Sequence, residues 1–179
     1  MRDDAAVTRW ALAAGAGDES AVERFVAATR PDVRRFVIYL TGDPQVADDL
    51  TQETFLRALR TLPRFAGRSS ARTWLFSIAR RAVVDRVRYD KARPVLVCTE
   101  AWQNLAEAAQ PRHLPGVDEG VVLEDLVAKL SAERRQAFLL TQLVGLPYAE
   151  AAAVSGCPIG TVRSRVNRAR RTLTAQLLT

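Results

Sequence analysis

The segment whose residue types best suit binding chemistry lies near the C-terminus. GTVRSRVNRARRTL, residues 160–173, holds five arginines and no acidic residue. At about 100° per residue, a helix would separate this segment into two arcs. The apolar arc contains Val162, Val166, Ala169 and Leu173, and the opposite arc contains Arg163, Ser164, Asn167, Arg168 and Arg171. Such polar side chains bind base edges and phosphates, although a merely solvated C-terminal helix is the plainer alternative.

Residue types within the polar arc predict different contacts. Arg163 and Arg168 are the candidate base readers, because a guanidinium can donate two hydrogen bonds to guanine O6 and N7. Asn167 suits adenine for a similar reason. Arg170 and Arg171 are better suited to phosphates.

The residues before this helix favour the nucleic-acid reading. In LPYAEAAAVSGCPIGTVRSRV, Pro147 is suited to the first turn of a helix. Residues 148–154 are rich in alanine and are expected to form a short helix. Gly156 suits a C-terminal cap and Cys157-Pro158 a turn. This order is typical of a helix-turn-helix, whose second helix enters the major groove, although a plain helical hairpin would also satisfy it.

A second informative segment is ADDLTQETFLRALRTLPRF, residues 47–65. A helical wheel buries Ala47, Thr51, Phe55, Ala58, Leu59 and Leu62, and it groups Asp49, Gln52, Glu53, Leu56 and Arg60 on the other side. A leucine framed by carboxylates and an amide indicates a protein-binding surface, although single exposed leucines are common. Asp48 and Asp49 are not a catalytic pair, because adjacent helical positions point in different directions.

The third segment, SSARTWLFSIARRAVVDRVRYDKAR, is apolar on most sides and is expected to be central to its domain. One stripe differs, since Trp74, Ser77, Arg81 and Arg88 lie close together on the wheel. An aromatic ring among arginines suits single-stranded nucleic acid, because bases stack on the ring while cations follow the backbone. The alternative is that Trp74 belongs to the core. The preceding loop, RFAGRSSA, is small and polar and could receive an unstacked base.

These segments require helices to position them, and nearly every longer segment has helical apolar spacing. Helices are predicted at 4–15, 18–40, 45–61, 71–90, 119–130, 131–143, 147–155 and 159–176, with Pro31 opening or kinking a turn. Residues 93–118 contain three prolines and no sustained period. We therefore predict an all-α fold of two small domains, an N-terminal helical bundle (1–92) and a C-terminal helix-turn-helix domain (119–179), joined by a flexible linker (93–118).

Composition narrows the function classes. The formal net charge is +6 and the pI about 10.1, which favours an acidic partner such as nucleic acid. The chain lacks a long apolar run, a secretory signal and a metal-ligand or phosphate-loop motif, and its single histidine is His113. Cys98 and Cys157 match no redox spacing. We expect a cytoplasmic protein without membrane insertion, cofactor, metal or enzymatic activity.

Three quoted segments, in this order, resemble a known family. DDLTQETFLRAL, RFAGRSSARTWLFSIARRAVVDRVR and GLPYAEAAAVSGCPIGTVRSRVNRARRTL resemble the core-binding, promoter-opening and upstream-element segments of an extracytoplasmic-function (group IV, sigma-70 family) sigma factor. The resemblance covers nearly the whole chain. LLTQLVGLPYAEAAAVSGCPIGT is similar to the sigma-C-type subgroup of actinobacteria.

The resemblance implies roles for individual residues. Binding of the RNA polymerase core, at the β′ clamp coiled coil, is implied for Asp49, Gln52, Glu53 and Leu56. Recognition and melting of the −10 element is implied for Phe65, Arg68, Ser69, Trp74, Ser77, Arg80, Arg81 and Arg88. Recognition of the −35 element is implied for Gly160, Arg163, Ser164, Asn167, Arg168 and Arg171. The linker would thread toward the polymerase active centre, and the β flap and an anti-sigma factor are further implied partners.

One position and one segment differ from the family pattern. Family members commonly have Asn where this chain has Arg81, so the −10 stripe is more cationic here, and the linker is less acidic than expected. The predicted function is that of an alternative sigma factor, which directs promoter-specific initiation by reading both elements and assisting melting. The alternative is a stand-alone helix-turn-helix regulator that binds duplex DNA without polymerase and needs neither the acidic face nor the Trp74 stripe.

Overall fold

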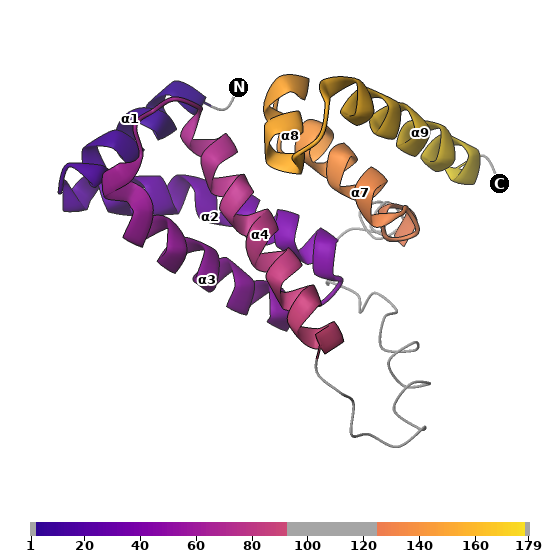
Figure 1. Cartoon of the computed structure of the whole chain (residues 1–179), viewed down its shortest axis with the longest axis horizontal. Coiled ribbons are helices and arrows are strands. Elements are labelled where there is room, and N and C mark those ends of the chain that lie inside the picture. Colours follow the sequence, from indigo (N-terminus) through magenta and orange to yellow (C-terminus); the bar gives the residue numbers. More distant parts are fainter. Residues whose placement is uncertain (1–2, 93–124, 178–179) are drawn as a thin grey trace, which may run out of the picture.

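The computed structural model describes residues 3–92 and 125–177, and every regular element in these ranges is helical. The N-terminal unit contains α1 (Asp4–Gly15), α2 (Glu19–Thr41), α3 (Pro44–Thr61), the 3-10 turn η1 (Leu62–Arg64) and α4 (Ala71–Ala92). The C-terminal unit contains α7 (Ala132–Phe138), the π turn η2 (Leu139–Leu143), α8 (Tyr148–Ser155) and α9 (Ile159–Leu177). The predicted all-α class is confirmed (Figure 1). The predicted linker lies outside the described residues.

Aspartates mark the starts of the first three helices. Asp3, Asp18 and Asp43 each accept a hydrogen bond from a backbone N–H of the following turn, at 2.8, 3.0 and 2.8 Å. These carboxylates satisfy donors that have no intrahelical partner, and they lie at the favourable end of each helix dipole. Gly42 ends α2 in the left-handed conformation, with φ of 72°.

Helix α2 continues through Pro31, where the sequence predicted an opening or kinked turn. Pro31 removes one backbone donor, but the residues around it lie on a buried face. Phe25, Thr29, Val33 and Phe36 are all at most 1% exposed. Their burial against the other helices therefore outweighs the missing hydrogen bond.

Helix α4 is the centre of the N-terminal unit, as its apolar character predicted. Its Leu75 and Phe76 are buried, and the Phe76 ring meets Phe36 edge to face with centroids 5.2 Å apart. Edge-to-face pairs add stability beyond the area they bury. Helix α4 packs against α1, α2 and α3, and it also contacts α8.

A buried arginine that the sequence analysis did not single out joins several elements. Arg72 of α4 is only 3% exposed, and its guanidinium lies 3.0 Å from Asp32 of α2 and 3.3 Å from Asp4 of α1. It also donates to the carbonyl of Val144, at 2.9 Å, in the C-terminal unit. A buried charge is tolerated only when it is paired in this way.

The two helical units lie side by side (Figure 1). Helix α4 packs on α8, and α2 packs on α7 and η2. Arg135 of α7 donates to the Tyr39 carbonyl at 3.4 Å and to Leu130 at 3.2 Å, and burial lowers its pKa. The helix-turn-helix unit therefore rests on the N-terminal bundle in this structure.

Gly15 provides a test of the packing between α1 and η1. A Cβ at this position would stand 2.6 Å from the Leu62 carbonyl oxygen, whereas a Cβ at Gly160 would meet nothing within 4 Å. Alanine normally stabilises a helix relative to glycine. We expect Gly15→Ala to lower the free energy of unfolding by about 1–3 kcal/mol, measured by urea denaturation, while the Gly160→Ala control does not. Equal stability of the two variants would contradict this packing.

Candidate nucleic-acid interface

The C-terminal unit has the predicted helix-turn-helix geometry. Gly156 ends α8 in the left-handed conformation, with φ of 65°, and α9 begins at Ile159. The predicted apolar arc of α9 is buried: Val162, Val166 and Ala169 are 0% exposed. Tight packing of α9 on α7 and α8 fixes which arc faces outward.

The outward arc of α9 carries the predicted −35 readers. Exposed residues on it are Gly160, Arg163, Ser164, Asn167, Arg168 and Arg171. No carboxylate of the described residues forms an ion pair with Arg163 or Arg168. Their guanidinium groups are therefore available to a ligand.

Two other arginines of α9 have structural partners. Arg170 donates to the side chain of Gln142 at 2.8 Å, and Arg165 lies 3.5 Å from the Cys157 sulfur. The phosphate contact predicted for Arg170 would have to compete with Gln142. Arg170 therefore connects α9 to η2, and Arg165 connects α9 to the turn that precedes α9.

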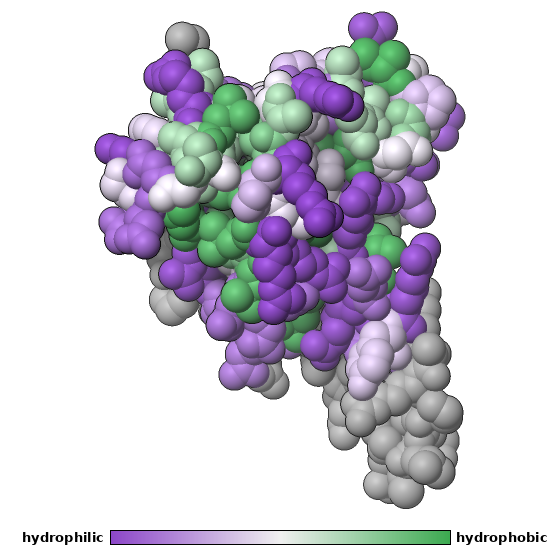
Figure 2. Space-filling model, turned by 60° about the vertical axis from the view of Figure 1, so that its left-hand side comes forward, coloured by the Kyte–Doolittle hydropathy of each residue, from purple (hydrophilic) through white to green (hydrophobic). Residues whose placement is uncertain are grey.

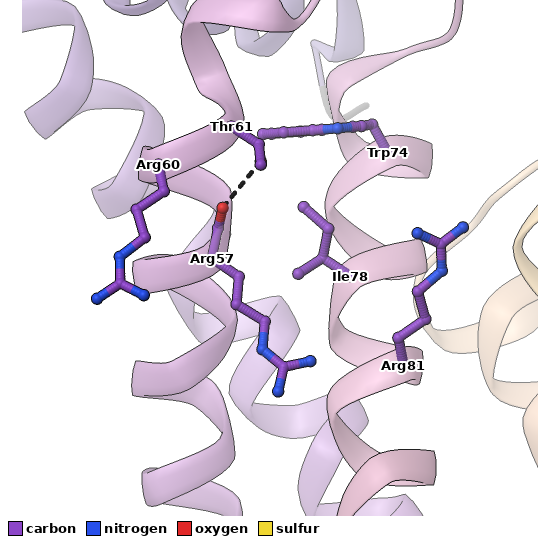
Figure 3. A pocket seen from close by; sticks show the side chains of 6 residues that line it. All are labelled: Arg57, Arg60, Thr61, Trp74, Ile78 and Arg81. Atoms are coloured by element: carbon purple, nitrogen blue, oxygen red, sulfur yellow. Dashed lines mark hydrogen bonds between the residues drawn. The ribbon is translucent and has the colours of Figure 1, made fainter.

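A pocket of about 400 Å³ lies between α3 and α4. Its lining consists of Arg57, Arg60, Thr61, Trp74, Ile78 and Arg81. In Figure 3 the Trp74 indole extends from α4 toward Thr61 of α3 and lies above Ile78. Trp74 is half-buried, and its ring centroid is 5.0 Å from that of Phe65 in the preceding loop. The tryptophan is thus neither a plain core residue nor an isolated surface one.

The three arginines of this pocket differ in their partners. Arg57 donates to Glu53 at 2.7 Å and to Asp85 at 2.8 Å, and these hydrogen bonds, with Asp85 first, raise its pKa. Arg60 and Arg81 form no ion pair with a described carboxylate. The free positive charge beside the indole therefore comes from Arg60 and Arg81. The sequence analysis had placed Arg60 on the protein-binding side and had not connected it with Trp74.

The structure brings only part of the predicted −10 set together. Trp74 and Arg81 line the pocket, Phe65 packs on Trp74, and Arg68 and Ser69 are exposed in the loop before α4. Three further members have other surroundings. The Ser77 hydroxyl donates to the Thr73 carbonyl at 2.8 Å, and Arg80 is half-buried. Arg88 is exposed, and seven residues beyond Arg81 it stands about 10 Å farther along α4.

The predicted polymerase-binding face on α3 is largely open. Asp49 and Gln52 are exposed and Leu56 is 44% exposed, whereas Glu53 is half-buried and paired with Arg57. Asp48 points to Arg34, 2.5 Å away, and this hydrogen bond lowers the pKa of Asp48. In Figure 2 hydrophilic side chains predominate on the surface shown, and hydrophobic ones appear between them in small groups.

The loop before α4 is covered on one side by the C-terminal unit. Glu150 of α8 accepts hydrogen bonds from Ser70, at 2.8 Å, and from Thr73. Nothing in the alanine-rich sequence around Glu150 indicated this contact, because its partners lie 77 and 80 residues away. The end of the predicted −10 loop and the helix-turn-helix unit therefore share an interface.

The described residues lack two features, a membrane-spanning helix and a metal-binding cluster. In residues 3–92 and 125–177, no helix combines the length and apolar character needed to cross a bilayer. Within the same ranges, no three His, Cys, Asp or Glu side chains lie close enough together to hold a metal ion.

Comparison with known proteins identifies both units. Residues 25–93 match the family model of sigma-70 region 2, and residues 121–173 match that of sigma-70 region 4. The chain is 51% identical over 173 residues to the ECF RNA polymerase sigma factor SigC of Mycobacterium tuberculosis, covering 97% of this chain and 92% of that protein. It is 38% identical over 155 residues to the ECF RNA polymerase sigma factor EcfG of Rhodopseudomonas palustris, covering 85% and 82%.

Solved structures agree in fold. The structure of CnrH in complex with the cytosolic domain of CnrY matches with a TM-score of 0.70 and 28% identity, over 96% of this chain and 97% of that one. The sigma factor RpoE of Bartonella quintana, in complex with the anti-sigma factor NepR, matches with a TM-score of 0.69 and 28% identity, over 88% and 96%. The chain therefore belongs to the sigma-70 family and is an extracytoplasmic-function RNA polymerase sigma factor of the sigma-C type.

Proposed function

We propose that this chain is a dissociable specificity subunit of bacterial RNA polymerase, which binds the core enzyme through α3 and reads two promoter elements with its two units. The observation that carries the proposal is the separation of charge. Unpaired carboxylate and amide groups face outward on α3, whereas unpaired arginines face outward on α9 and at the Trp74 pocket. Such a protein acts in the cytoplasm, where polymerase and chromosome are.

The −35 element is read by α9. Arg163 and Arg168 donate to base edges, and Asn167 and Ser164 add hydrogen bonds beside them. Arg171 binds a phosphate, and the exposed Gly160 lets the DNA backbone approach the start of the helix. Buried valines on the other arc hold α9 at a fixed angle, so that these groups enter one groove together.

The −10 element is bound as a single strand at the pocket between α3 and α4. Unstacking a base costs a few kcal/mol, and stacking on Trp74 together with phosphate contacts to Arg60 and Arg81 offsets that cost. Arg68 and Ser69 extend the site into the loop, with Phe65 supporting Trp74. Ser77, Arg80 and Arg88 would follow the strand along α4.

Polymerase binding distinguishes this function from a stand-alone duplex-binding regulator. Asp49, Gln52 and Leu56 form an exposed face that a regulator without polymerase does not need. Glu53 contributes less directly, because Arg57 already neutralises its charge. An anti-sigma factor, such as the one in the Bartonella complex, is a further partner that we propose for this chain.

Reading both elements requires the two units to separate. Contacts of Glu150 with Ser70 and Thr73 place α8 against the start of α4. A promoter presents its two elements at distant points on the duplex, so each unit must follow its own element. The linker then keeps both units on one DNA, and each raises the effective concentration of the other.

Reversing the charge of Asp49 tests polymerase binding. We expect Asp49→Lys to weaken association with core polymerase by about tenfold or more, because a cation replaces an unpaired carboxylate in the interface. Fluorescence anisotropy of the labelled protein titrated with core enzyme measures this. Glu23→Lys, an equal charge change at an exposed position of α2, serves as the control. Wild-type affinity of the Asp49 variant would show that Asp49 does not contribute to binding of core polymerase.

Truncating Arg168 tests base reading. We expect Arg168→Ala to cost about 1–3 kcal/mol at one position of the −35 element and little elsewhere. In vitro transcription from a promoter library with core polymerase gives this preference directly. Arg171→Ala is the matched variant, since loss of a phosphate contact weakens all sequences alike. A uniform loss with Arg168→Ala would show that Arg168 does not read a base.

Removing the Glu150 carboxylate tests the interface between the units. We expect Glu150→Ala to favour the separated form, because two hydroxyl donors lose an ionised acceptor, a contact worth about 1.5–3 kcal/mol. Small-angle scattering would then show a larger radius of gyration than the wild type has. Glu133→Ala, an exposed acid at the start of α7, is the control. An unchanged radius would mean that other contacts hold the units together.

A further inference from the structure

We propose that one face of α1 positions the loop 65–70 and so determines how strongly the protein discriminates between −10 sequences. This inference rests on the proposed −10 site. The face consists of Asp4, Thr8, Leu12 and Gly15, and it is called the α1 face below. Helix α1 precedes residues 25–93, the segment that matches sigma-70 region 2.

The spacing of the α1 face matches one side of a helix. Its members lie at i, i+4, i+8 and i+11, so all four positions lie on one side of the helix. Each member contacts one position in the segment from η1 to α4. The two segments run in opposite directions, so the last member of the α1 face contacts the first of these positions. Their counterparts are Leu62 for Gly15, Gly67 for Leu12, Ala71 for Thr8 and Arg72 for Asp4. The α1 face therefore follows the whole loop, from η1 before it to the first turn of α4 after it.

Thr8 determines where α4 begins. Its hydroxyl donates to the Asp4 carbonyl at 2.8 Å, and the oxygen accepts the backbone N–H of Ala71 at 3.1 Å. Ala71 is the first residue of α4, whose N–H has no partner inside the helix. Ser70 accepts the N–H of Thr73 at 3.2 Å. The start of α4 is thus capped partly from another helix, and the loop must end where Thr8 holds it.

Leu12 lies beside the earlier part of the loop, and Gly15 lies against η1, which precedes the loop. Leu12 is 43% exposed, yet its methyl carbons lie 3.5 Å from the place that a Cβ of Gly67 would occupy. Gly67 has φ of 65°, so the loop turns sharply where Leu12 supports it. Gly15 leaves no spare room against Leu62. These contacts prevent the loop from moving toward α1.

Asp4 and Phe65 complete the arrangement. Asp4 forms an ion pair with the buried Arg72, at 3.3 Å, which holds the first turn of α4 on α1. On the pocket side of the loop, Phe65 packs on Trp74. The loop therefore lies between the α1 face and the indole at the pocket. A change in the α1 face shifts the loop relative to that indole without altering any residue proposed to touch DNA.

Substitution of Thr8 separates positioning from general stability. Thr8→Val keeps the shape but removes the acceptor, whereas Thr8→Ser keeps the acceptor. The readout is the ratio of transcription from the preferred −10 sequence to that from single-base variants, using core polymerase and a promoter library. We expect Thr8→Val to lower this ratio about fivefold and Thr8→Ser to restore it. Leu12→Ala, at a partly exposed position, should act in the same direction. Preferences at −35 should be unchanged.

The outcomes are distinct. A uniform loss on every promoter, or an equal change at −35 and −10, would make the α1 face merely structural and overturn the inference. A Thr8→Ser variant as impaired as Thr8→Val would also overturn it, since the acceptor would not matter. If the wild type itself showed no −10 preference, the proposed function would fail and the inference with it. Amide exchange at Ala71 gives a second measurement, and Thr8→Val should accelerate it.

Discussion

The packing of the helices in this protein depends on the interactions of one buried group, the guanidinium of Arg72. An arginine that is 3% exposed must find partners for its charge, and those partners come from four parts of the chain: Asp4, Asp32, the Phe76 ring and the Val144 carbonyl. Removing both aspartates would leave this buried charge without a counter-ion. One side chain thereby ties the first two helices to α4, and ties the N-terminal bundle to the unit that carries the helix-turn-helix.

Because Arg72 stands in the first turn of α4, this constraint acts on the loop directly before it. The same turn receives Thr8 from α1 on one side and Glu150 from α8 on the other. In the proposed function, contacts within the N-terminal bundle persist when DNA binds and position the loop for it. The contact with α8 is different, since it must break when the two units move to separate promoter elements. The start of α4 therefore links the folded core to the change in arrangement that the proposed function requires.

The distribution of charge follows a similar division between structure and function. Carboxylates that pair with arginines of another helix, such as Asp48 with Arg34 and Asp85 with Arg57, hold helices together at the surface, where each pair contributes little free energy by itself. The residues that we propose for binding have no such partner among the described residues: Asp49 on α3, and Arg60, Arg81, Arg163 and Arg168 on the other surfaces. A protein that binds both an enzyme and a polyanion needs its carboxylates and its arginines on separate surfaces. Carboxylates on the DNA-binding surface would repel the phosphates of the polyanion.

The sequence by itself determined the helices and their faces, because apolar periodicity and capping residues act over a few positions. The buried arc of α9, the Gly156 cap and the central place of α4 were all predicted correctly, and α2 runs through Pro31 as the helix predicted at 18–40 does. Only the tertiary structure decided which charges stay free. The charge of Arg57 is paired with Glu53 and Asp85, Arg60 joins Trp74 at a pocket, and Glu150 reaches a loop 80 residues earlier. Such contacts join residues that are far apart in the chain. A local sequence pattern cannot predict them, because only folding brings these residues together.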